Sequence, residues 1–129
     1  MGNTNLFIIA QAVSSHSPVS ANFAKSHSNE VSGLVLWAAY PASGDDLSAS
    51  GLRVVSIYGT LDGLSTGAKI DASRALLPTD TTWQAIKGGN HAQFGWYGDQ
   101  AGDNPAAISR SDQQSQAVAA TLALLESLK

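Results

Sequence analysis

The sequence predicts an α/β fold, a mostly parallel sheet of three to four strands flanked by helices. Three observations lead to this prediction. Short apolar runs alternate along the chain with stretches of helical pattern. One run, Leu34 to Ala39, is apolar throughout, which is typical of a strand covered on both faces. A stretch of helical pattern, 68–77, lies between the runs 52–58 and 81–86, as expected where parallel strands are joined by a crossover helix.

Each expected strand has its own signal. Leu6 to Ala10 is a short apolar run that we interpret as a strand or the start of a helix. Leu34 to Ala39 is the first clear strand, and Leu52 to Tyr58 is the second. Thr81 to Ile86 is the third, because Trp83 and Ala85 alternate with polar neighbours.

Two helices are expected after these strands. Ala68 to Leu77 carries spaced apolar residues, and the proline at position 78 predicts that this helix ends just before it. Ser111 to Leu128 has the strongest helical pattern, because Val118, Leu122 and Leu125 recur at i, i+4 and i+7 and predict its buried face. Ser111 is the expected N-cap of this helix.

Composition narrows the class of protein. The 129 residues suit one compact domain, so we expect a single domain over 1–129. A net charge of −3 argues against a general nucleic-acid binder, and no apolar run approaches the roughly 18 residues that span a membrane. No Lys or Arg precedes Lys25, so a secretory signal is not indicated and a cytoplasmic location is favoured. With no cysteine there is no disulfide, thiolate ligand or cysteine nucleophile.

Two polar side chains follow neighbouring strands of the expected sheet. Asp62 lies four residues after Tyr58, and His91 lies just after the third clear strand. Ligands of open parallel sheets bind beyond the carboxyl ends of the strands. An Asp that accepts from a His ring fixes the tautomer of the imidazole and supports its charged form. We therefore expect Asp62 and His91 to pair as the acid and base of a triad, with a nucleophile earlier in the chain.

Three segments carry a resemblance to a known family. They are Gly33-Leu-Val-Leu-Trp-Ala-Ala-Tyr-Pro-Ala42, Ser56-Ile-Tyr-Gly-Thr-Leu-Asp62 and Gly88-Gly-Asn-His-Ala-Gln-Phe-Gly-Trp-Tyr-Gly98. Together they resemble the C-terminal half of an α/β-hydrolase, most similar to the dienelactone-hydrolase and carboxylesterase types, over roughly residues 21–129. The resemblance implies a truncated α/β-hydrolase-like sheet, Asp62 as triad acid, His91 as general base and a last helix over 108–129 that packs on the sheet.

The nucleophile is the point where the chain departs from this family. His16-Ser17 resembles the His-Ser of the nucleophile elbow, so Ser17 is the candidate nucleophile, but the flanking glycines are absent. Pro18 has no N–H to donate to an oxyanion hole. Ser17 followed by Pro18 is also a common helix start, with the serine as N-cap. Ser15 is a second candidate nucleophile.

Other polar and aromatic groups have weaker functional signals. The acidic pairs Asp45-Asp46 and Asp99/Asp103 lack the pattern of a calcium loop, so we expect no metal and no cofactor. His16 and His27 are expected at the surface. The aromatic residues Phe94, Trp96 and Tyr97 line a substrate pocket near the histidine at position 91 or belong to the core, and the sequence leaves both open.

Two functional hypotheses follow. The first is a serine hydrolase that acts on a small carboxylic ester, with Ser17, Asp62 and His91 as its triad. The second is a catalytically inactive, truncated hydrolase domain that acts through association. A sheet of so few strands leaves an edge exposed, and exposed edges pair with other chains, so we also expect a homo-oligomer or a partner chain at that edge.

Overall fold

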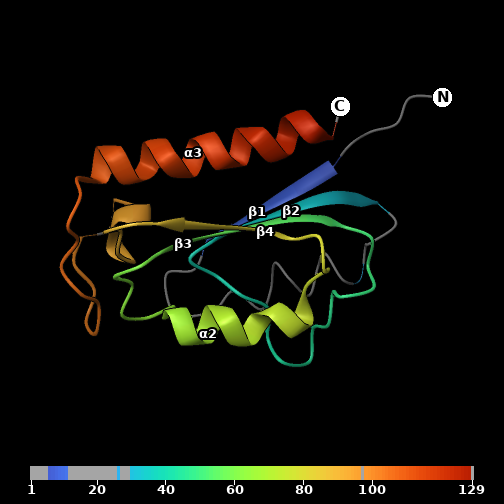
Figure 1. Cartoon of the computed structure of the whole chain (residues 1–129), viewed down its shortest axis with the longest axis horizontal. Coiled ribbons are helices and arrows are strands. Elements are labelled where there is room, and N and C mark those ends of the chain that lie inside the picture. Colours follow the sequence, from blue (N-terminus) through green and yellow to red (C-terminus); the bar gives the residue numbers. More distant parts are fainter. Residues whose placement is uncertain (1–5, 12–25, 27–29, 97, 129) are drawn as a thin grey trace.

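In the described part of the chain, four strands form one parallel sheet in the order β1-β2-β3-β4 (Figure 1). The structure, a computed structural model, describes residues 6–11, 26, 30–96 and 98–128. The strands are β1 (Leu6–Gln11), β2 (Val31–Trp37), β3 (Arg53–Gly59) and β4 (Thr82–Ile86). The helices whose bounds the structure describes are α2 (Gly67–Ala72) and α3 (Arg110–Ser127), with short 3-10 turns η1 (Ser73–Leu76) and η2 (Ala92–Phe94).

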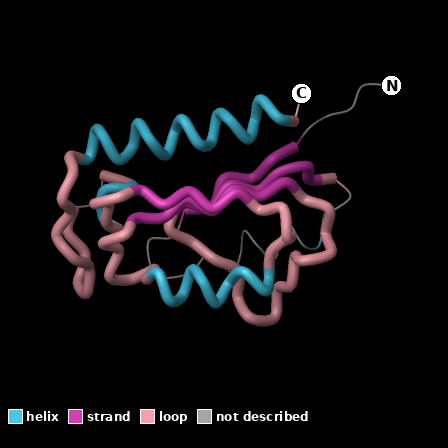
Figure 2. Tube along the Cα trace, viewed as in Figure 1, coloured by secondary structure: helices cyan, strands magenta, loops and turns pink. Residues whose placement is uncertain are grey.

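The helices cover the sheet from both sides, so the chain forms three layers (Figure 2). Helix α3 lies along one face, and α2 with η1 lies across the other (Figure 1). One hydrophobic cluster includes Leu34, Leu36 and Leu77, and the other includes Val35 and Ala117. Successive residues of β2 therefore point into opposite layers, which explains its unbroken apolar sequence. The predicted α/β class with a parallel sheet is confirmed.

Most predicted elements are present with shifted ends. The segment near the N-terminus is a strand, the first of its two predicted alternatives. Strand β2 begins three residues earlier than predicted and ends at Trp37. It ends there because Ala38 has a φ of 51°, which turns the backbone out of the extended conformation. The first predicted helix begins at Gly67, tightens to a 3-10 turn at Ser73 and ends before the proline, as expected.

The predicted buried face of α3 is wrong. Val118 and Leu122 are 45% and 52% exposed. The residues that face the sheet are Gln113, Ala117, Thr121 and Leu124. The N-cap is also different, because the Ser109 side chain, rather than that of Ser111, accepts the N–H of Asp112 at 3.0 Å.

Polar residues occupy this buried face because their hydrogen bonds are satisfied inside the protein. The Thr121 hydroxyl donates to the carbonyl of Ala117 at 2.8 Å and accepts from the Trp37 indole N–H at 3.0 Å. A buried hydroxyl with two partners costs little. The small side chain of Ala117 also lets the helix approach the sheet closely. The spacing of large apolar residues in the sequence indicates neither the internal hydrogen bonds of Thr121 nor this close approach.

No helix in the described part of the chain is both long and apolar enough to cross a membrane.

Replacing Ala117 with leucine tests the corrected face of α3. Ala117 is fully buried, so the larger side chain is expected to lower the free energy of unfolding by about 1–3 kcal/mol. Urea denaturation measures this change. Ala119→Leu is the matched control, because Ala119 is exposed on the same helix and its substitution should stay within about 0.5 kcal/mol. Equal losses of unfolding free energy in the two variants would contradict the placement of Ala117 on the buried face of α3.

Candidate active site

The carboxyl ends of β3 and β4 lie side by side and lead into two loops. We call residues 60–66 the Asp62 loop and residues 87–91 the His91 loop. Backbone hydrogen bonds join the two loops at their base. The Thr60 N–H donates to the Ile86 carbonyl at 3.1 Å, and the Leu61 N–H donates to the Gly89 carbonyl at 2.8 Å. The parallel register of the strands therefore continues into the loops that hold the candidate residues.

Glycine is required where the end of β3 touches the His91 loop. A Cβ atom on Gly59 would lie 2.4 Å from the Gly89 carbonyl oxygen, closer than any side chain tolerates. Gly88 has a φ of +80°, which favours glycine. Gly59 thus allows close backbone contact, Gly88 allows a tight turn, and a Cβ atom on Gly89 would lie 2.9 Å from the Gln113 side chain.

Asp62 and His91 form a buried hydrogen bond, as expected from their positions in the sequence. The His91 Nδ1 atom lies 2.8 Å from the Asp62 Oδ2 atom, and both side chains have zero exposed surface. The other oxygen of Asp62 accepts the backbone N–H groups of Leu64 at 2.8 Å and Ser65 at 2.7 Å. A carboxylate only accepts, so Nδ1 carries the proton, and Nε2 of the neutral ring is left as the basic nitrogen.

A third strand also anchors the Asp62 loop. The Ser65 hydroxyl donates to the Ala38 carbonyl at 2.7 Å, and Ala38 directly follows β2. The Ala38 N–H in turn donates to the Ile57 carbonyl of β3 at 2.8 Å. The left-handed turn at Ala38 therefore directs its carbonyl toward the loop that carries the carboxylate.

Helix α3 supports the His91 loop through Gln113, which is fully buried. Its side-chain oxygen accepts the Asn90 N–H at 3.1 Å, and its amide group donates to the Asn90 carbonyl at 2.7 Å. Both backbone groups of the residue before His91 are thus held by one side chain. Gln113 was not among the predicted site residues, because nothing in its sequence context distinguishes it from the other glutamines of the helix.

Asp103 is the second residue that sequence reasoning missed. Its Oδ1 atom accepts the N–H of Gly63 at 3.0 Å and of His91 at 3.2 Å, and its Oδ2 atom accepts the N–H of Ala92 at 2.9 Å. The sequence predicted no role for Asp103, because the pair Asp99/Asp103 lacks the pattern of a calcium loop. Among the described residues, no group of three or more acidic, histidine or cysteine side chains is placed to hold a metal ion.

Five of the residues singled out in the sequence cannot be placed. Ser17, Ser15, His16, His27 and Tyr97 lie outside the described residues.

The two described aromatic residues near His91 have different environments. Phe94 is buried, and its ring centroid lies 6.3 Å from that of Trp37, so it belongs to the core. Trp96 is 79% exposed, and the Arg110 guanidinium lies 4.8 Å from its ring centroid. Of the two alternatives left open by the sequence, core packing therefore holds for Phe94.

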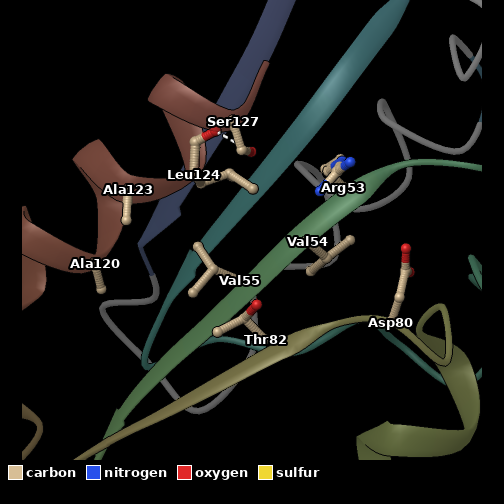
Figure 3. A pocket seen from close by; sticks show the side chains of 9 residues that line it. All are labelled: Arg53, Val54, Val55, Asp80, Thr82, Ala120, Ala123, Leu124 and Ser127. Atoms are coloured by element: carbon tan, nitrogen blue, oxygen red, sulfur yellow. Dashed lines mark hydrogen bonds between the residues drawn. The ribbon is translucent and has the colours of Figure 1, made fainter. Parts of the chain in front are cut away.

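A pocket of about 160 Å³ lies at the other end of the sheet, between α3 and the first residues of β3 and β4 (Figure 3). Arg53 and Thr82, which begin these two strands, line it together with Leu124 of α3. It is remote from Asp62 and His91, which follow the carboxyl ends of the same strands. Ligand sites of open parallel sheets lie at the carboxyl ends, so this pocket is not the candidate active site.

Comparison with known proteins identifies a family but no individual relative. A family model described as "Alpha/beta hydrolase family" matches residues 3–115. The match includes the Asp62 loop, the His91 loop and the first turn of α3. No curated protein and no solved structure matches the chain. The likeness to the dienelactone-hydrolase branch stays a prediction, because the matched model describes the family as a whole.

Removing the Asp62 carboxylate tests how strongly the buried pair is integrated into the fold. Asp62→Ala leaves the ring Nδ1–H and two backbone N–H groups without an acceptor, so the free energy of unfolding should fall by about 3–5 kcal/mol. Asp71→Ala is the control. Asp71 pairs with Arg74 at the surface, at 3.3 Å and 70% exposure, and its loss should cost less than about 1 kcal/mol. Similar losses in denaturant titrations of the two variants would contradict this reading.

Proposed function

The chain belongs to the alpha/beta hydrolase family, and we propose that it is a serine hydrolase that cleaves small carboxylic esters. The observation that carries the proposal is the buried Asp62–His91 hydrogen bond of 2.8 Å beyond the carboxyl ends of β3 and β4. Family membership supports a hydrolase. The ester substrate and the triad are the finer parts of the proposal.

In the proposed reaction His91 is the general base and Ser17 the nucleophile. The His91 Nε2 atom takes the hydroxyl proton as the Ser17 oxygen bonds to the ester carbonyl carbon. The carbon–oxygen bond to the alcohol then breaks, and His91 returns the proton to the leaving alcohol. Water repeats the sequence on the acyl-enzyme, which releases the acid and restores the serine. Asp62 orients the ring and stabilises the imidazolium throughout.

In the proposed reaction Asp62 stays ionised and neither gains nor loses a proton. Its two oxygens already accept three N–H groups, so it acts as a fixed negative charge beside the ring. Because the pair is fully buried, water does not compete for this hydrogen bond and its electrostatic effect on the ring is strong. This is the environment in which a carboxylate supports an imidazolium most effectively.

Turnover of p-nitrophenyl acetate tests the triad. His91→Ala and Ser17→Ala should lower kcat by roughly 10⁴-fold or more, and Asp62→Asn by about 10⁴-fold because it stabilises the wrong tautomer. The exposed Asp71→Asn variant is the control and should keep its turnover. Unchanged turnover in His91→Ala would refute the proposed triad.

A fluorophosphonate probe identifies the nucleophile independently of the substrate. Covalent labelling should map to Ser17 and disappear in Ser17→Ala. Labelling at Ser15 would move the nucleophile to that residue, and no labelling at any serine would overturn the mechanism.

Pro18→Ala decides whether Ser17 is a nucleophile or only a helix cap. It supplies the missing N–H donor, so a nucleophilic Ser17 should gain up to about 100-fold in kcat, whereas a cap would leave kcat unchanged.

We also propose that the chain forms a homodimer through β1. Among the described residues β1 has one neighbouring strand, β2, and Ile9 of β1 is 48% exposed. Unpaired backbone groups of an edge strand are a template for a second chain. Sedimentation velocity should therefore show a dimer that Ile9→Lys weakens, while the exposed control Ala119→Lys does not. A monomer at all concentrations would refute the dimer.

A further inference from the structure

We propose that Asp103 is a positioning residue that sets the geometry of the Asp62–His91 pair. The inference rests on the proposed function for its consequence in catalysis, although its structural basis is independent of the substrate. Asp103 does not contact the His91 ring in any hydrogen bond that the structure shows. It acts on the backbone of both loops that carry the pair.

One oxygen atom of Asp103 joins the two loops directly. Its Oδ1 atom accepts from Gly63, the residue after Asp62, and from the backbone N–H of His91 itself. The same side chain thus fixes the chain next to the acid and the chain at the base. Any shift of one loop relative to the other stretches a hydrogen bond to a charged acceptor, which is the stronger kind.

The neighbouring residue reinforces this link. Asn104 donates its side-chain amide to the Leu61 carbonyl at 3.0 Å, and its own carbonyl accepts from the Asn90 side chain at 2.8 Å. We call residues 100–104 the bridging turn. Through Asp103 and Asn104 it makes two hydrogen bonds to the Asp62 loop and three to the His91 loop and the first residue of η2.

The bridging turn also packs closely against the Asp62 loop. A Cβ atom on Gly63 would lie 2.3 Å from the Gly102 carbonyl oxygen and 3.0 Å from the Asp103 Cα atom. The turn is therefore in direct backbone contact with the Asp62 loop. Gly102 has a φ of +89°, a conformation that favours glycine and brings the turn to this position.

A carboxylate suits this role better than its amide. It has two oxygens with about four acceptor sites, and three of them are used by N–H groups here. An asparagine would turn an NH₂ group toward the Ala92 N–H. Asp99 provides the contrast, because it lines the same cleft of about 400 Å³ as Asp103 and makes no hydrogen bond or ion pair in the described part of the chain.

The experiment follows the His91 Nδ1–H proton by NMR in ¹⁵N-labelled protein. This proton is buried and donated in a hydrogen bond to the Asp62 carboxylate, so it should exchange slowly with water, and its loss in His91→Ala identifies it. In folded Asp103→Ala we expect exchange on the order of ten-fold faster or loss of the signal. Asp103→Asn keeps the volume and one acceptor oxygen, so it should give a smaller increase and a folded variant in any case. Asp99→Asn should match the wild type.

The same variants are then assayed for ester hydrolysis. Asp103→Ala should lower kcat with little change in KM, because it displaces the reacting groups without weakening substrate binding. Asp103→Asn should recover part of the lost kcat. Wild-type exchange of the Nδ1–H proton in the folded Asp103 variants would overturn the positioning role, whatever their stability. Absence of His91-dependent hydrolysis in the wild type would instead refute the proposed function, and the exchange measurement would still decide the role of Asp103.

Discussion

The buried hydrogen bond between Asp62 and His91 is the interaction on which the rest of this site depends. A carboxylate with no exposed surface is tolerated only when its oxygens are fully hydrogen-bonded. The Asp62 loop supplies that environment by turning two backbone N–H groups, from Leu64 and Ser65, onto one oxygen. The second oxygen is then directed at the imidazole. The turn of the Asp62 loop thus satisfies the charge of its own carboxylate inside the protein.

The same helix that covers the sheet also completes the site. Along one face of α3, Leu124 and Ala117 pack on the strands, and Gln113 holds the backbone of the residue before His91. One face of α3 therefore both packs on the sheet and holds the His91 loop. Its polar buried residues are retained because each finds partners in the sheet or in the His91 loop.

The sequence was sufficient for the parts of the molecule that depend on local patterns. The apolar run of β2 and the position of Asp62 and His91 after consecutive strands predicted a parallel sheet with the two side chains meeting at its carboxyl end. The roles of Asp103 and Gln113 were not predictable, because their partners lie between 11 and 40 residues away. The buried face of α3 was mispredicted for a related reason, since its polar residues are satisfied by contacts distant in sequence.

The attachment of Gln113 to the His91 loop has a consequence for how the molecule opens. Proteins unfold locally in cooperative units whose members share hydrogen bonds. Fraying of the first two turns of α3 would free both backbone groups of Asn90 and, with them, the loop that holds His91. The geometry of the acid–base pair therefore depends on the first turn of α3 staying folded. Partial opening of this end of α3 would therefore disturb the pair even while the strands stay paired.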